Sequence, residues 1–262
     1  FVFQLSLSRK FNNFIVIEKT KTVYCFIPKT GCTTTKLVFY NLEHDVNITD
    51  FEKDNSWIHR QTFTKLGSYS KEDIHIRLKT YNKFIVVRDP LERLVSAWLD
   101  KFVNSRSRWM YIHNYQRKTN TTYLQLITAN GSASWKRHDD LPNVSFRDFI
   151  RAIIDQKYIN GHWKTFYELC DPCQIEYDFI AHTDTLAEDF HLFFRKIGAV
   201  GKECILPRQH ESRAERIVGN TFREVSAGDL RRIREIYKAD FDMFGYSFDE
   251  NLSLIKKYKD MP

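Results

Sequence analysis

Short apolar strands alternate with amphipathic helices along this chain, and that alternation restricts the fold more than any other feature. Residues 22–27 form an apolar run, rich in β-branched and aromatic side chains, that Pro28 ends, and a helical pattern resumes after Gly31. Residues 84–87 begin a second unit of this kind, and residues 177–181 begin a third. Strands that are apolar on both faces are typical of a parallel sheet covered by helices, so we predict an α/β fold.

Local signals mark where several helices begin. Asp89 is placed as the N-cap of the helix after the second strand, with Pro90 at its first position, Glu92 at its third and apolar residues up to Phe102. Ser/Thr caps predict three more helices: 146–157 after Ser145, 186–197 after Thr185 and 227–239 after Ser226. Residues 104–142 are polar and weakly periodic, so long surface loops are expected there.

The composition is that of a globular protein. Of 262 residues, 42% are hydrophobic and 28% are charged, which excludes a disordered, collagenous or coiled-coil chain. A single core at this length buries roughly three quarters of the unfolded surface, so residues 1–262 are expected to form one domain. The net charge of +7 favours a polyanionic partner, which leaves nucleic acid, an anionic membrane and an acidic polysaccharide open.

An excess of Asn-x-Ser/Thr sequons favours a glycosylated protein of the secretory pathway. There are five, at Asn47, Asn120, Asn130, Asn143 and Asn251, where chance predicts about two. Sequons also scatter through cytosolic proteins, and that alternative stays open here. No apolar run approaches the ~18 residues of a membrane span. Because the chain starts at Phe1 rather than Met, a signal or anchor segment upstream is also left open.

Cysteine usage agrees weakly with that compartment. Of the five cysteines, only Cys170 and Cys173 are a close pair, and no second ligand pair nearby completes a zinc site. We therefore interpret this pair as able to form disulfides. The connectivity of Cys170, Cys173 and Cys204 is left open.

Residues 28–36 join a predicted strand to a predicted helix and contain Lys29, Gly31 and a run of threonines. A glycine turn at a helix N-terminus exposes backbone N–H groups and the positive end of the helix dipole, which together favour an anion. Three consecutive β-branched residues are poor helix starters, so another role for them is expected. The segment is not a Walker A loop, because Lys36 has no glycine before it and no Ser or Thr after it. A purely structural turn is an equally acceptable interpretation of this segment alone.

Arg88 follows the second predicted strand, and Ser96 lies in the next helix. On a helical wheel Arg93, Ser96 and Asp100 share the polar side, which a solvated helix face also explains. The sharper hypothesis places Arg88 and Ser96 around a phosphate at the carboxyl edge of the sheet, where open α/β sheets bind ligands. Anion sites at two adjacent strand ends suggest a nucleotide with phosphate-like groups at both ends.

At these motifs the sequence resembles the Golgi carbohydrate sulfotransferases, which include the chondroitin and dermatan 4-O-sulfotransferases and the HNK-1 type. The similarity lies in ordered blocks along most of the chain: 86–97, 100–102, 162–163, 169–173, 177–180 and 237–246. This sequence departs from the family pattern in two places. Family members usually have Gly-Lys-x-Glu at the positions of residues 181–184, and they commonly have Trp at the position of Thr35. The resemblance implies a P-loop-like three-layer sandwich with a central, mostly parallel sheet flanked by helices.

The resemblance also implies a reaction, the transfer of a sulfuryl group from 3′-phosphoadenosine 5′-phosphosulfate to a sugar hydroxyl. Lys29 is implied to stabilise the charge that grows on the leaving phosphate. The implied 5′-phosphosulfate loop consists of Lys29, Thr30, Gly31, Cys32, Thr33, Thr34 and Thr35. Arg88 and Ser96 are implied to bind the 3′-phosphate. This chemistry requires no metal.

A general base must accept the proton of the sugar hydroxyl. We favour His162, which lies in a family-like His-Trp block, and keep Glu43 and His59 as weaker candidates. A uronate-bearing acceptor is expected to contact basic residues of the polar segment: Arg106, Arg108, Arg117, Lys118, Lys136 and Arg137.

By resemblance, the acceptor is the 4-hydroxyl of N-acetylgalactosamine in chondroitin-type glycosaminoglycan, and nucleic acid is not expected as a partner. The resemblance places the protein in the Golgi lumen, attached to the membrane only through an anchor upstream of this chain. One alternative is a non-catalytic glycosaminoglycan-binding module on the same scaffold. Another is a P-loop kinase, which needs a Walker A loop and a Mg²⁺-binding Asp after a strand, whereas Asp89 is placed as a helix cap.

Overall fold

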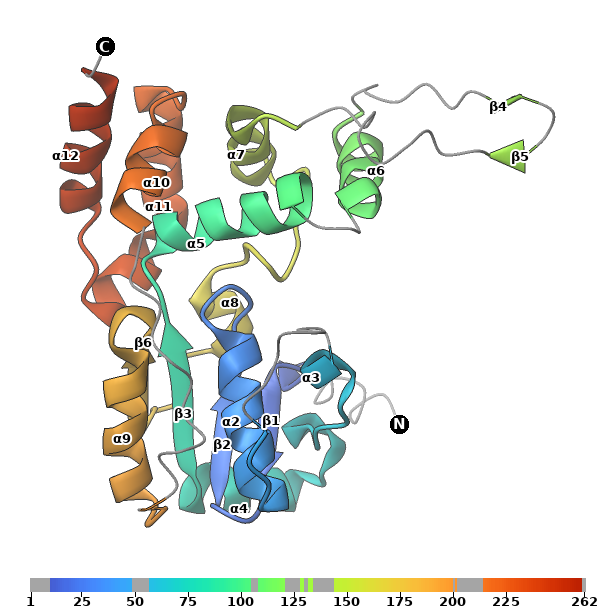
Figure 1. Ribbon diagram of the computed structural model, residues 1–262, viewed down its shortest axis with the longest axis vertical. Coiled ribbons are helices and arrows are strands. Elements are labelled where there is room, and N and C mark those ends of the chain that lie inside the picture. The colour runs from blue at the N-terminus through green and yellow to red at the C-terminus, as the bar shows by residue number, and fades with distance from the viewer. Residues whose placement is uncertain are drawn as a thin grey trace. The chain divides into compact units, whose positions relative to one another are not determined.

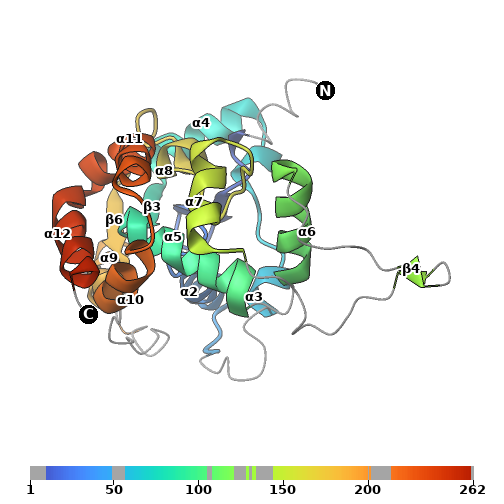
Figure 2. The same ribbon diagram turned by 90° about the horizontal axis from the view of Figure 1, so that it is seen from above.

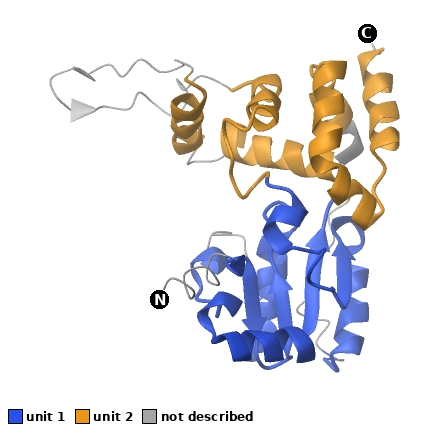
Figure 3. Ribbon diagram, turned by 180° about the vertical axis from the view of Figure 1, so that it is seen from behind, with its two compact units in different colours: residues 1–88, 164–212 blue, residues 89–163, 213–262 orange. Residues whose placement is uncertain are grey.

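The computed structural model describes residues 10–48, 57–104, 108–120, 128–129, 132–133, 144–199, 201 and 214–260. The chain forms two compact units, each built from two stretches of sequence (Figure 3). Unit 1 is Phe1–Arg88 with Lys164–Ser212, and unit 2 is Asp89–Trp163 with Arg213–Pro262. The central sheet belongs to unit 1, and the described part of unit 2 is mainly helical.

The sheet of unit 1 has the strand order β1-β2-β3-β6 (Figure 1). Its strands are β1 (Phe14–Ile17), β2 (Thr22–Cys25), β3 (Asn82–Val87) and β6 (Phe179–His182). β1 pairs antiparallel with β2, whereas β2 and β3, and β3 and β6, pair in parallel. The predicted, mostly parallel sheet is confirmed, and the carboxyl ends of β2, β3 and β6 meet at one edge.

Helices cover both faces of this sheet. They are α2 (Cys32–His44), α3 (Trp57–Arg60), α4 (Lys71–Thr80), α8 (Phe166–Cys170) and α9 (Leu186–Lys196). α2 and α9 pack on one face, where Phe39 and Phe193 bury their rings against Phe84 of β3. The ring centroids of Phe84 and Phe193 are 4.5 Å apart, and those of Phe39 and Phe84 are 5.3 Å apart.

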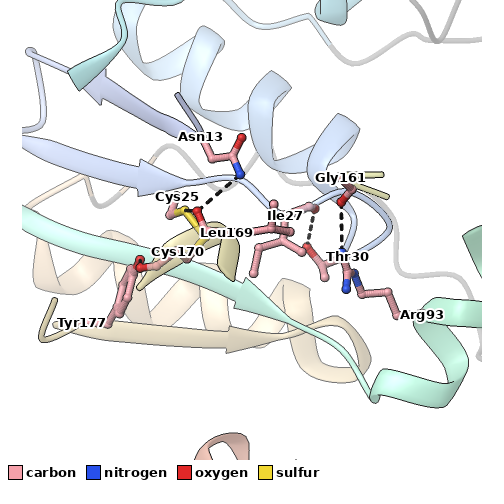
Figure 4. Close-up of a disulfide and its surroundings, with 9 residues drawn as sticks. All are labelled: Asn13, Cys25, Ile27, Thr30, Arg93, Gly161, Leu169, Cys170 and Tyr177. Carbon is pink, nitrogen blue, oxygen red and sulfur yellow. Dashed lines mark hydrogen bonds between the residues drawn. A yellow bond between two sulfur atoms is a disulfide. The ribbon is translucent and has the colours of Figure 1, made fainter. Parts of the chain in front are cut away.

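A disulfide joins the opposite face of the sheet to α8. Successive side chains of a strand alternate between faces, so Cys25 points away from the face that its neighbour Tyr24 shares with α2. Cys25 is bonded to Cys170, 145 residues further along the chain (Figure 4). Cys170 therefore does form a disulfide, but its partner lies in β2 and is not Cys173. Cys204 lies outside the described residues.

The helices of unit 2 pack around α5. They are α5 (Pro90–Trp98), α6 (Arg108–Thr119), α7 (Phe146–Ile154), α10 (Ala214–Phe222), α11 (Ala227–Phe244) and α12 (Phe248–Lys259). A π-helical turn, Leu99–Asn104, continues α5, and α5 contacts α7, α10 and α11 (Figure 2). Leu94, Phe149 and Ile233 are fully buried in the core that these helices enclose.

The predicted helix caps are confirmed in three places and wrong in one. Asp89 caps α5, and the side chains of Ser145 and Ser226 accept hydrogen bonds from the third amide of α7 and α11. α7 is shorter than predicted, and α11 is longer. Thr185 stands at the N-cap of α9 without capping it, because its hydroxyl lies 2.8 Å from a carboxylate oxygen of Asp189.

The segment predicted as long surface loops contains a helix. α6 lies within it, and two short strands, β4 (Thr128–Ala129) and β5 (Ser132–Ala133), pair antiparallel further on. Tyr111 and Tyr115 are buried against Phe102 of the π-helical turn, with ring centroids 6.3 and 6.1 Å from it. Together with fully buried Ile112, these rings form the buried face that stabilises α6. Within the described residues, no helix has the length and apolar character needed to cross a membrane.

Candidate active site

The loop between β2 and α2 takes a backbone conformation that suits an anion cradle. Lys29 and Gly31 both have left-handed φ angles, 74° and 73°. Gly31 is the N-cap of α2, and a Cβ atom added to it would lie 3.3 Å from Leu186. Glycine meets both the positive φ and the close approach without strain. The loop therefore turns sharply and presents the first turn of α2 at the carboxyl edge of the sheet.

The threonines of this loop mainly hold its shape. The hydroxyl of buried Thr30 donates to the carbonyl of Ile27 at 2.9 Å (Figure 4), and that of Thr35 donates to the carbonyl of Gly31 at 3.1 Å. Thr33 pairs instead with the ring nitrogen Nε2 of His59 at 2.8 Å. The hydroxyls of Thr30 and Thr35 therefore already donate to backbone carbonyls of the loop itself.

Backbone amides supply the donors of the cradle. The first helical hydrogen bond of α2 runs from the amide of Thr35 to the carbonyl of Gly31 at 3.0 Å. The amides of Cys32, Thr33 and Thr34 precede it and donate to no acceptor among the residues described, and the first turn contains no acidic residue. Unused amides and the positive end of a helix dipole together favour a bound anion.

Arg88 comes to the same cradle from the neighbouring strand. It follows β3, which pairs in parallel with β2, and its Nη1 lies 3.4 Å from the carbonyl oxygen of Lys29. Two cations, Lys29 and Arg88, therefore stand at adjacent strand ends, as the sequence predicts.

A third strand end at this edge was missed from the sequence. His182 ends β6 in register with Val87, the residue before Arg88, and Thr183 follows it. The hydroxyl of Thr183 is buried and lacks a hydrogen-bond partner in the described structure. The signal was the predicted strand at 177–181, because any residue that follows a parallel strand reaches the carboxyl edge.

Asp89 acts as a helix cap in unit 2. Its Oδ1 accepts hydrogen bonds from the amides of Leu91 and Glu92 at 2.9 and 3.1 Å. Its Oδ2 accepts from the side-chain nitrogen of Asn251 at 2.6 Å. Both carboxylate oxygens are therefore engaged within unit 2, which disfavours the Mg²⁺-binding role that a kinase would give this residue.

The polar side of α5 is less solvated than its pattern suggests. Ser96 is half-buried, whereas Arg93 is only 1% exposed and its Nη2 donates to the carbonyl of Gly161 at 3.3 Å (Figure 4). The interpretation of Arg93 as part of a solvated face is therefore wrong. Its guanidinium anchors the loop that carries His162.

His162 lies in a loop that is fixed at several points. Trp163 donates from its indole nitrogen to the carbonyl of Tyr158 at 2.7 Å, and the hydroxyl of Tyr237 donates to the carbonyl of Trp163. Asn160 Oδ1 accepts from the backbone amide of His162 at 3.0 Å and lies 2.7 Å from its ring nitrogen Nδ1. Since the backbone amide can only donate, the oxygen of Asn160 faces His162, and Nδ1 carries the proton in the neutral ring. Nε2 is then the basic nitrogen.

Sequence comparison identifies the family. The model of the sulfotransferase family matches residues 12–247, a range that includes residues of both units. The chain belongs to the sulfotransferase family. It is 32% identical to carbohydrate sulfotransferase 11 of Rattus norvegicus over 248 residues, which are 92% of this chain and 68% of the relative. It is 32% identical to carbohydrate sulfotransferase 10 of Xenopus laevis over 88% of this chain and 66% of the relative, and 31% identical to carbohydrate sulfotransferase 9 of Homo sapiens over 88% and 52%. No solved structure gives a significant match.

As a sulfotransferase, this enzyme uses 3′-phosphoadenosine 5′-phosphosulfate as its sulfuryl donor. The cradle suits such a dianionic group, because it combines three unused amides with the cations of Lys29 and Arg88. Among the described residues, no group of three or more His, Cys, Asp or Glu side chains is arranged to hold a metal ion.

The remaining candidate residues of this sulfotransferase lie at different distances from the cradle. His59 contacts the cradle through Thr33, whereas Glu43 accepts from the backbone amide of Lys19 near the opposite end of α2. α2 rises ~1.5 Å per residue, so Glu43 lies well away from the cradle. Arg117 and Lys118 are exposed in the last turn of α6, and Arg108 lies half-buried at its start. Three further candidates lie outside the described residues: Arg106, Lys136 and Arg137.

Proposed function

We propose that this enzyme transfers the sulfuryl group of 3′-phosphoadenosine 5′-phosphosulfate to a sugar hydroxyl, the 4-hydroxyl of N-acetylgalactosamine in chondroitin-type glycosaminoglycan. The observation that carries the proposal is the cradle of Cys32, Thr33 and Thr34 amides with Lys29 beside Arg88. The names of the relatives support a carbohydrate acceptor. The choice of sugar and hydroxyl rests on the resemblance of the motifs to the 4-O-sulfotransferases.

In this proposal the 5′-phosphosulfate binds at residues 29–35, and the 3′-phosphate binds Arg88 and Ser96. The donor supplies the sulfuryl group and leaves as 3′-phosphoadenosine 5′-phosphate. Lys29 and the amides of the first turn of α2 stabilise the charge that grows on the leaving phosphate as its bond to sulfur breaks. No metal ion takes part.

His162 is proposed as the general base that accepts the proton of the attacking hydroxyl. The support is its tautomer, since Asn160 holds the proton on Nδ1 and makes Nε2 the basic nitrogen. His59 is a second candidate, because it contacts Thr33 of the cradle. Comparing His162→Ala with His59→Ala separates the two: the base variant loses turnover and keeps donor affinity.

We further propose that the two units form a single sulfotransferase domain in the Golgi lumen, attached through an anchor upstream of this chain. The family match to residues of both units supports one domain. The Cys25–Cys170 disulfide and the exposed sequon residues Asn47 and Asn120 support an oxidising compartment of the secretory pathway. The exposed Arg117 and Lys118 of α6 are proposed to contact the polyanionic acceptor.

The test is transfer of labelled sulfate to unsulfated chondroitin, dermatan, heparosan and N-acetylgalactosamine-capped glycans, with binding of 3′-phosphoadenosine 5′-phosphate measured in parallel. We expect transfer to chondroitin, loss of transfer in Lys29→Ala, and loss of donor binding in Arg88→Ala. The exposed Lys79, on α4 of the same unit, gives a matched control, Lys79→Ala. Full activity in either cradle variant would refute the site. A wild-type protein that binds chondroitin but not the nucleotide would instead be a non-catalytic glycosaminoglycan-binding module.

A further inference from the structure

Two lysine side chains of unit 1 converge on one aromatic ring beside the cradle. The ammonium nitrogen of Lys36 lies 4.0 Å from the ring centroid of Phe26, and that of Lys65 lies 4.4 Å from the same centroid. The two nitrogens therefore cannot be further apart than the sum of these distances.

Backbone contacts fix the positions of Lys36, Lys65 and Phe26. Lys36 lies in α2, one turn after the amides of the cradle, and helical side chains lean towards the N-terminus of their helix. Lys65 forms a bridge with Ile15 of β1, and its carbonyl accepts the hydroxyl of Ser68 at 2.7 Å. Phe26, directly after β2, donates its amide to Asn13 at 2.9 Å. The pair therefore stands at the same edge of the sheet as the cradle.

The two ammonium groups of the pair place like charges around one ring. Lys36 is only 8% exposed, and neither lysine forms an ion pair with a carboxylate in the part of the chain that the structure describes. Burial, followed by repulsion from Lys36, lowers the pKa of Lys65 to about 8. Burial also lowers the pKa of Lys36. The Phe26 ring offers each ammonium a cation–π contact, but it does nothing to reduce their mutual repulsion.

We propose that Lys36 and Lys65 form an anion subsite that binds the carboxylate of an acidic sugar next to the acceptor hydroxyl. The proposal rests on the function proposed above, in which the two anionic ends of the donor already have their partners in residues 29–35 and in Arg88 with Ser96. A third anion in the reaction must then come from the acceptor. In a uronate-bearing polysaccharide, the acid lies on the sugar adjacent to the one that is sulfated.

The test compares chondroitin with carboxyl-reduced chondroitin as acceptors for the wild type, Lys65→Met, Lys65→Arg and the control Lys79→Met, whose lysine is exposed on α4 of the same unit. We expect Lys65→Met to raise the KM for chondroitin about tenfold or more, the usual effect of losing a hydrogen bond to a charged group. The KM for carboxyl-reduced chondroitin and for the donor should stay within about twofold in that variant. Lys65→Arg should keep most of the affinity, and Lys79→Met all of it.

Three results for Lys65→Met would overturn the subsite. The KM could rise equally for chondroitin and carboxyl-reduced chondroitin, or the KM for chondroitin could stay unchanged. The KM for the donor could rise instead, which would assign the pair to the sulfuryl group. A wild type that binds 3′-phosphoadenosine 5′-phosphate yet sulfates none of chondroitin, dermatan or heparosan would overturn it too, while the donor assignment stands. Loss of nucleotide binding in the wild type would instead refute the proposed function. As an independent readout, the NMR signal of ¹³C-methylated Lys65 should shift when chondroitin is added and stay unchanged with the carboxyl-reduced polymer.

Discussion

Replacing both Cys25 and Cys170 by alanine tests how much the disulfide stabilises unit 1. The bond joins residues 145 positions apart, and in the chain-entropy model a loop of that length restricts the unfolded state by about 5 kcal/mol at 25 °C. Measured values for disulfides are typically about 2–4 kcal/mol, so we expect a loss of about 3–5 kcal/mol in the free energy of unfolding. For a protein of this size that corresponds to a fall of roughly 10 °C in Tm.

The assay is urea unfolding of the oxidised wild type, the wild type in reductant, the double variant and a control, Cys32→Ala. Cys32 is a half-buried free thiol, so its removal should change stability by less than about 1 kcal/mol. The double variant should also show a larger m value, because an unfolded chain without the cross-link exposes more surface. If reduced and oxidised wild type unfold at the same urea concentration, the bond does not constrain the unfolded state, and the reasoning is refuted.

Three further predictions follow from single contacts. Asn160→Ala should lower kcat about tenfold at unchanged donor KM, because the ring of His162 loses the acceptor that holds its proton on Nδ1. Asn160→Asp keeps an acceptor oxygen and should keep activity. Steady-state kinetics of both variants checks this. The KM for chondroitin should rise as the pH passes about 8, since Lys65 is charged below its pKa and neutral above it. Lys65→Arg should abolish that rise. The KM of both proteins, measured over a pH series, checks this. Asn251→Gln should leave the glycan mass of secreted protein unchanged, because the side-chain nitrogen of Asn251 already donates to Asp89 and to the carbonyl of Ser247. Replacing the exposed Asn47, by Asn47→Gln, should lower that mass. Mass spectrometry separates the two.

Features set by neighbouring residues could be predicted from the sequence. The caps at Ser145 and Ser226 act within one helical turn, so the pattern of three or four residues was sufficient to place α7 and α11. The meeting of Lys29 and Arg88 needed one further step, the knowledge that parallel strands end at the same edge.

Features set by contacts between distant segments could not be predicted. The partner of Cys170 lies in β2, and nothing in the spacing of the cysteines indicates it. Arg93 is buried and donates to the carbonyl of Gly161, which comes from a loop far along the chain. The lysine pair escaped detection for the same reason, since Lys65 reaches Phe26 only because its backbone bridges to β1.

The consecutive charged residues after β3 have separate roles. An aspartate next to Arg88 in sequence would ordinarily weaken it as an anion-binding group. Asp89 instead accepts the amides of Leu91 and Glu92 and the side chain of Asn251, and it is buried. These donors and the positive end of the α5 dipole compensate the carboxylate charge, so little of it acts on Arg88. The carboxylate therefore organises the start of α5, while the guanidinium of Arg88 lies beside the carbonyl of Lys29.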